Sequence, residues 1–125
     1  MVRAVLEGVA FSQRQGIDLM RASGATATTA RGAGGGFSSP IWRQFLADVL
    51  NIGIQTTSAG IGAARGAAIL AGMGTNLYTN PDRGIDWSTE SVTSPDPCKH
   101  TALDRAYQDY VDLYPRLKGA FATHR

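Results

Sequence analysis

The segment Gly34–Leu50, "GGGFSSPIWRQFLADVL", is the most informative stretch of this sequence. Three glycines come directly before Ser39-Pro40, and serine followed by proline is typical of a helix N-cap and first helical position. Apolar residues then recur at helical spacing from Ile41 to Leu50. The segment therefore predicts a bare backbone turn joined directly to the start of an amphipathic helix.

The glycine turn has two interpretations. Glycine lets backbone N–H groups approach a ligand closely, and the start of a helix carries a partial positive charge, so a nucleotide site is one of them. However, no P-loop motif is present, and Phe37 stands where the dinucleotide fingerprint needs its third glycine. The glycines alone leave both a simple turn and a nucleotide site open, and they favour the turn.

The regions around this segment predict further elements. Helical periodicity predicts a helix over residues 2–22. "TATTARGA" and "IGIQTT" favour short strands, and Gly53 is expected to end the central helix or the loop after it. "IGAARGAAILAGMG" predicts a helix whose small residues permit close approach to a sheet or another helix. The face of the first helix expected to be buried consists of Val2, Val5, Leu6, Val9, Ile17 and Met20.

The C-terminal third predicts a loop followed by a helix. Turn-forming residues are concentrated over 79–99, and residues 100–122 predict an amphipathic C-terminal helical segment. Pro115 is expected to bend or restart that helix. Tyr107, Tyr110 and Tyr114 share one face and are interpreted as core residues. The order of elements indicates an α/β architecture with about two strands, whose exposed edges favour self-association.

Composition and charge narrow the function classes. The 125 residues make one domain, and their 12 basic and 10 acidic side chains are scattered without a basic block. Binding to nucleic acid or to a membrane surface therefore has no electrostatic support. The longest mainly apolar run is too short to span a bilayer, and the N-terminus lacks a signal-peptide pattern. With the single cysteine, these features favour a cytoplasmic location.

No residue pattern predicts a catalytic set or a metal site. His100 and His124 lack neighbouring ligands at metal spacing and are interpreted as solvated. Cys98 is interpreted as an incidental thiol rather than a reactive one. Asp48, on the helix after the glycines, is interpreted as a packing or surface carboxylate rather than a catalytic group. Trp42 is expected in the core.

Four segments in register carry a resemblance to a known family. "RAVLEGVAF", "GGGFSSPIWRQFLADVL", "GAARGAAILAGMG" and "YQDYVDLYPRLKGAF" occur in the order typical of the C-terminal domain of FGGY-family carbohydrate kinases, most similar to the xylulokinases. The resemblance covers nearly the whole chain. It implies part of the C-terminal lobe of an actin-like ATPase (ribonuclease H-like) fold, with helices packed on a small sheet and ATP bound between two lobes.

The resemblance also assigns a role to the glycine turn, which in this family holds the adenosine end of ATP mainly through backbone. Phe37 stands where the family pattern has alanine, so its ring is expected to lie where adenosine docks, altering or abolishing binding. Gly60 and Ile61 replace a glutamate pair found in many relatives, ahead of the small-residue helix Gly62–Ala68 near the lobe hinge. The implied nucleotide-binding positions are Gly34, Gly35, Gly36, Phe37 and Pro40.

The function implied is phosphoryl transfer by a larger protein. The full-length enzyme, with ATP and Mg²⁺, would move the γ-phosphate to a ketopentose hydroxyl. The sugar site, the catalytic aspartate and the phosphate loops belong to parts that precede residue 1, including the N-terminal lobe. The chain over residues 1–125 is thus expected to be a fragment that is inactive alone. The alternative is a non-catalytic ATP-binding, regulatory or structural remnant of such a kinase.

Overall fold

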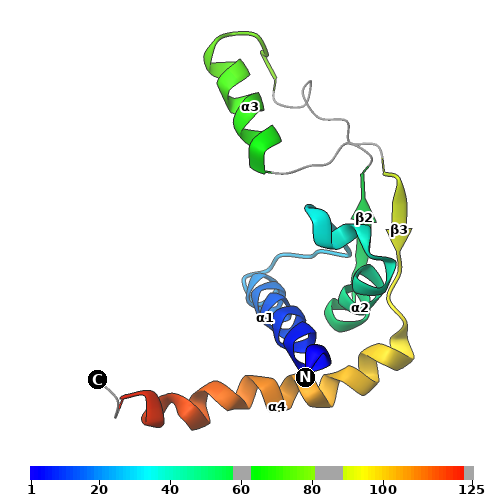
Figure 1. Ribbon diagram of the computed structural model, residues 1–125, viewed down its shortest axis with the longest axis vertical. Helices are drawn as coiled ribbons and strands as arrows, with labels where there is room; N and C mark the ends of the chain where they lie inside the picture. Colours follow the sequence, from blue (N-terminus) through cyan, green and yellow to red (C-terminus); the bar gives the residue numbers. More distant parts are fainter. Residues whose placement is uncertain (58–62, 81–88, 123–125) are drawn as a thin grey trace.

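A computed structural model describes residues 1–57, 63–80 and 89–122. Helix α2 lies against a small sheet, α1 and α4 pack against α2, and α3 stands away from them (Figure 1). This arrangement confirms the predicted α/β class. The described elements are α1 (Val2–Ala22), β1 (Thr29–Arg31), the 3₁₀ turn η1 (Gly35–Ser38), α2 (Pro40–Leu50), β2 (Gly53–Thr56), α3 (Ala63–Gly74), β3 (Ser91–Thr93) and α4 (Pro97–Ala122).

The sheet has the order β1-β2-β3. β1 pairs parallel to β2, with Ala30 opposite Ile54, and β3 pairs antiparallel to β2, with Thr93 opposite Ile54. β1, η1, α2 and β2 thus form a β-α-β unit, in which the helix carries the chain back to begin a parallel strand. The glycine turn lies at the carboxyl end of β1, where this unit turns from strand to helix.

The predicted loop over 79–99 is wrong in two places. Residues 91–93 form β3, because their backbone groups find partners on β2, a pairing that no local sequence signal reveals. The last helix begins at Pro97 rather than at residue 100, because Asp96 caps it: Oδ1 accepts hydrogen bonds from the N–H groups of Cys98 and Lys99. Residues 81–88 of that loop lie outside the described part of the chain.

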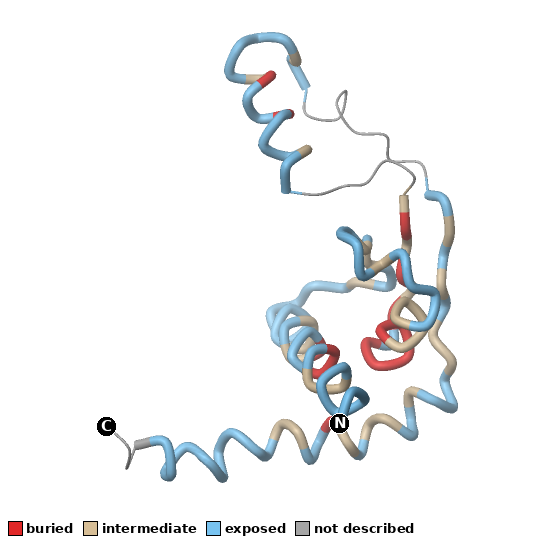
Figure 2. Tube along the Cα trace, viewed as in Figure 1, coloured by how far each residue is buried: buried red, intermediate tan, exposed pale blue. Residues whose placement is uncertain are grey.

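Helix α2 is the centre of the hydrophobic core. It packs against α1, α4 and β2, and five consecutive residues from Leu46 to Leu50 are buried (Figure 2). Burial of this apolar surface is the main favourable contribution to folding. The buried cluster consists of Ala10, Phe11, Leu46, Ala47, Val49, Leu50, Ile52, Ile54 and Tyr107.

The predicted buried face of α1 is wrong. Its buried side chains are Ala10, Phe11 and Arg14, because that stripe lies where α1 packs against α2 and α4. The expected face is instead largely exposed, and only Ile17 packs against the core. The exposed members are Val2, Val5, Leu6, Val9 and Met20.

Two expectations concern the ends and the course of helices. α2 ends at Leu50 with Asn51 in the left-handed conformation (φ 53°), and Gly53 starts β2, so Gly53 ends the loop after the helix, the second of the two places expected for it. α4 continues through Pro115. The surrounding turns of α4 are exposed, so water can bond the backbone groups that proline leaves without partners.

The tyrosine face of α4 is buried at only one end. Tyr107 is buried, as predicted, and its ring contacts Phe11 with centroids 5.7 Å apart. Tyr110 is half-buried and also contacts Phe11, whereas Tyr114 is 65% exposed. The core interpretation is therefore wrong for Tyr114, because α4 extends past the body of the protein there (Figure 1).

The small residues of α3 do not form the expected close contact with the sheet. Most of α3 is exposed in the described structure, and Gly72 and Ile69 are its buried residues. A Cβ on Gly72 would overlap the ring of Tyr78, which folds back onto the helix. Gly72 is thus needed for a contact within this segment, whereas Gly60, Ile61 and Gly62 lie outside the described residues.

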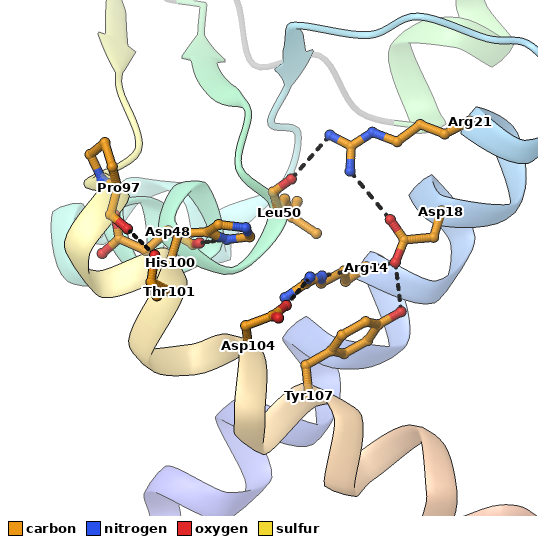
Figure 3. Close-up of polar contacts among 10 residues, drawn as sticks. All are labelled: Arg14, Asp18, Arg21, Asp48, Leu50, Pro97, His100, Thr101, Asp104 and Tyr107. Atoms are coloured by element: carbon orange, nitrogen blue, oxygen red, sulfur yellow. Dashed lines mark hydrogen bonds and ion pairs between the residues drawn. The ribbon is translucent and has the colours of Figure 1, made fainter.

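A polar cluster joins α1 to α4 (Figure 3). Arg14 donates to Asp104 at 2.5 Å, and its guanidinium carbon lies 3.9 Å from the centroid of the Tyr107 ring. The Tyr107 hydroxyl donates to Asp18 at 2.7 Å, and Arg21 bridges Asp18 to the Leu50 carbonyl of α2. These bonds fix the register of α4 against α1 and join α1 to the end of α2.

This cluster predicts a stability change at high pH. Burial, together with the hydrogen bond to the negatively charged Asp18, raises the pKa of Tyr107 to about 12. Since the unfolded tyrosine titrates near about 10, the contribution of Tyr107 is complete below that pH and is lost as pH rises toward 12. Urea unfolding at successive pH values should show a shallower decline between these limits for Tyr107→Phe than for the unmodified protein. Equal slopes would contradict the assignment.

Candidate functional site

The glycine turn follows β1, and the space next to Gly34 and Gly35 is free of other atoms of the described chain. Gly34 has φ +97°, a left-handed value that favours glycine, and Gly35–Ser38 form one 3₁₀ turn closed by the Phe37 N–H on the Gly34 carbonyl at 3.1 Å. A Cβ built on Gly34 or Gly35 would meet no atom of the described chain within 4 Å. A ligand can therefore approach the main chain here without meeting a side chain.

The helix start beside the turn forms as the sequence predicts. Ser39 is the N-cap of α2, and its Oγ accepts a hydrogen bond from the Trp42 N–H at 3.4 Å. Pro40 takes the first helical position, where its missing N–H removes no helix bond. The turn and the capped end of α2 are thus one continuous unit, because the Ser39 N–H also bonds the Gly36 carbonyl.

Two side chains hold the turn from within. Arg43 Nη1 donates to the Phe37 carbonyl at 2.6 Å, and Ser38 Oγ donates to the Gly35 carbonyl at 2.5 Å. The sequence analysis did not identify Arg43. Its only local signal is its position one helical turn after the N-cap, which directs a long side chain back over the start of the helix.

The Phe37 ring lies against the protein rather than on the open side of the turn. A Cβ built on Gly32 would overlap three ring carbons of Phe37, so the ring covers the Gly32 backbone. Phe37 also packs against the hydrophobic core as a half-buried residue. The ring thus lies over Gly32 rather than over Gly34 or Gly35, and the expectation that it lies where adenosine docks stays a prediction.

A cavity of about 920 Å³ begins beside the turn and extends between α1, α2 and α4. Gly36 and Ser39 border it at the turn, and Trp42 and Phe45 form an apolar wall. Trp42 is half-buried in this wall rather than fully in the core, with its ring centroid 6.0 Å from that of Phe45. Such walls suit a flat apolar group more than a charged one.

Asp48 joins α2 to the start of α4, consistent with the packing role inferred for it. Its side chain is 4% exposed. Oδ1 accepts hydrogen bonds from the Asp96 N–H at 2.8 Å and from Gln44 Nε2 at 2.7 Å, while Lys99 Nζ lies 4.0 Å from Oδ2. Oδ1 is thus engaged by the fold, while Asp48 as a whole also lines the cavity that begins at the glycine turn.

The remaining candidates from the sequence are two histidines and one cysteine. His100 Nδ1 lies 2.9 Å from the Asp48 carbonyl oxygen, so the interpretation of His100 as a solvated loop residue is wrong (Figure 3). Because a carbonyl only accepts, Nδ1 carries the proton in this contact. Cys98 is an exposed free thiol, and His124 lies outside the described residues.

Comparison with known proteins identifies the family. The family model for the C-terminal domain of the FGGY family of carbohydrate kinases matches residues 1–75.

The chain belongs to the FGGY family of carbohydrate kinases.

Individual relatives agree with this membership. The chain is 30% identical over 118 residues to a xylulose kinase of Staphylococcus epidermidis, covering 93% of this chain and 24% of the relative. It is 35% identical over 116 residues to the xylulose kinase of Bacillus subtilis, covering 93% and 23%. The solved structure of a xylulose kinase from Brucella ovis, titled "xyloylose kinase", has a TM-score of 0.77 and 33% identity, covering 95% and 25%.

The FGGY relatives also fix the fold. Their structures have the actin-like ATPase fold, and this chain has the corresponding part of its C-terminal lobe. The chain spans about a quarter of the length of the relatives that it matches. Among the described residues no helix is long and apolar enough to cross a bilayer.

Proposed function

We propose that this chain supplies the adenosine-binding part of an FGGY kinase that transfers the γ-phosphate of ATP to a ketopentose hydroxyl. The proposal includes a cytoplasmic location and absence of activity in the 125 residues alone. The observation that carries it is the side-chain-free outer face of Gly34 and Gly35, placed between β1 and the capped start of α2. The xylulose kinases among the relatives support the choice of sugar class.

The residues of the turn fit a nucleotide. Gly34 and Gly35 offer main chain at an open surface, and Gly36 lies next to the Trp42 ring. Phe37 contributes backbone while its ring faces inward, and Pro40 starts the adjoining helix. The apolar cavity that begins at Gly36 offers flat packing surface nearby. When bound, ATP would supply the phosphoryl group, and the residues of this turn would orient its adenosine end.

The described residues do not fit Mg²⁺ in the same way. Within the ranges that the structure covers, no three histidine, cysteine or acidic side chains are grouped as a metal site. Asp48, the buried carboxylate nearest to the turn along the chain, already accepts two hydrogen bonds. No step of this chain's function is therefore assigned through the metal.

Calorimetric titration with the non-hydrolysable analogue AMP-PNP tests the proposal. The unmodified chain should bind, and Gly35→Val should lower the affinity by about tenfold or more, because it adds a branched side chain to the open face. Gly35 has no positive φ, and its Cβ position is free, so the variant should fold normally. Gly16→Ala, at an equally open position on α1, is the matched control. Equal affinity of Gly35→Val and the control would contradict the proposed site.

The second candidate is a non-catalytic module that associates with a second copy of itself. It is favoured by the exposed apolar face of α1, on which Val2 is 76% and Val5 67% exposed. β1 and β3 are the edge strands of the sheet that the described residues form, and edge strands favour pairing with another chain. Analytical sedimentation at increasing protein concentration tests this candidate. Formation of dimers by an unmodified chain that does not bind AMP-PNP would favour it.

A further inference from the structure

The position of the Phe37 ring depends on the absence of a side chain at Gly32. Gly32 has no left-handed φ, so its backbone conformation does not require glycine. What requires glycine is space: the Phe37 ring lies where the first side-chain carbon of any other residue at position 32 would be. The ring and the missing side chain are therefore complementary.

This contact ties the turn to the sheet. The Gly32 N–H donates to the Gln55 carbonyl of β2 at 2.9 Å, so Gly32 is fixed at the end of the β1–β2 ladder. Phe37 lies at the far end of the turn, where its N–H bonds Gly34 and its carbonyl accepts from Arg43. The turn is thus held by hydrogen bonds along its main chain and by the Phe37 ring, which packs on Gly32 at the end of the β1–β2 pairing.

We propose that Phe37 is a positioning residue for the glycine turn, with its ring seated in the space left by Gly32, so that the turn presents Gly34 and Gly35 outward. This inference rests on the proposed function, because the outward face is the one assigned to the nucleotide. Any side chain at position 32 would expel the ring from its seat. A displaced ring would no longer hold the turn against the end of β1, so the presentation of Gly34 and Gly35 should change.

The test is a double-mutant cycle of Gly32→Ala, Phe37→Ala and the double variant. Gly32→Ala should lower the melting temperature by several degrees in the unmodified background and should have little effect when Phe37 is already alanine. AMP-PNP affinity is measured at a temperature where each variant is folded. It should fall about tenfold for Gly32→Ala and also fall for Phe37→Ala, and the double variant should bind no more weakly than Phe37→Ala alone. If Gly32→Ala alone does not fold, refolding of the double variant gives the same answer.

The outcomes separate the two proposals. Additive effects of the two substitutions on the melting temperature would overturn the seating of Phe37 by Gly32. The effects of the two substitutions on the melting temperature could be coupled while the folded Gly32→Ala variant binds AMP-PNP with unchanged affinity. That result would overturn the positioning role, because a purely structural contact would not alter the affinity. Absence of AMP-PNP binding by the unmodified chain would instead overturn the proposed function, and the melting temperatures would still decide the seating.

Discussion

Replacing Leu46 by alanine is expected to lower the free energy of unfolding by about 2–5 kcal/mol. Leu46 is fully buried at the middle of α2, where that helix meets α1, α4 and β2. Alanine would remove the apolar atoms and leave a cavity that three neighbouring elements together prevent from closing. Since the described core consists of one small cluster, this loss is a large share of an ordinary domain's stability.

Urea unfolding followed by far-ultraviolet circular dichroism measures this change. Ile41→Ala is the matched control, because it shortens an aliphatic side chain on the same helix at a position that is 83% exposed. The control should change the free energy of unfolding by no more than about 0.5 kcal/mol. Similar losses for the two variants would show that α2 is not the centre of the core.

The features that local sequence signals predicted correctly are those decided within one turn of chain. The Ser39-Pro40 pair marks the start of α2 because capping and the missing proline N–H involve only neighbouring residues. The limits of α1 follow from its periodicity in the same way. The glycine turn was also located correctly, since three glycines between a strand and a helix admit few other structures.

The features that were missed depend on contacts between distant segments. Periodicity identified an apolar face on α1 but not which part of it would be covered, and Val2 and Val5 lie on the uncovered part. β3 forms only because β2 is beside it. Tertiary packing of this kind decides burial and short strands, and it overrides local propensity.

The candidate site shows the same division. The sequence predicted that the glycines and Pro40 lie together, but it did not show on which side of the turn the Phe37 ring lies. The direction of that ring is set by the space at Gly32, which only the folded backbone shows. Likewise, Arg43 and Gln44 are adjacent in sequence but donate hydrogen bonds to different segments. Arg43 donates to the Phe37 carbonyl in the glycine turn, and Gln44 donates to the Ser94 carbonyl in the segment before α4.

Replacing Asp48 by alanine is expected to lower the free energy of unfolding by about 1–3 kcal/mol, because it leaves the part-buried Asp96 N–H without an acceptor. Gln44 Nε2 also loses its bond to Oδ1 but keeps its bond to the Ser94 carbonyl. Asp96 caps α4, so loss of its anchor should also loosen the first turn of that helix.

Two further variants test whether the loss of stability comes from the hydrogen bonds of the Asp48 carboxylate. Asp48→Asn keeps one oxygen acceptor and should lose less stability than Asp48→Ala, whereas Asp109→Ala removes an exposed carboxylate from α4 and should change little. Amide hydrogen exchange should show faster exchange at His100, whose N–H bonds the Asp96 carbonyl, in Asp48→Ala than in Asp109→Ala. If unfolding and exchange were the same for both alanine variants, Asp48 would not be the connection between α2 and α4. Its burial would then have to be explained by a different role.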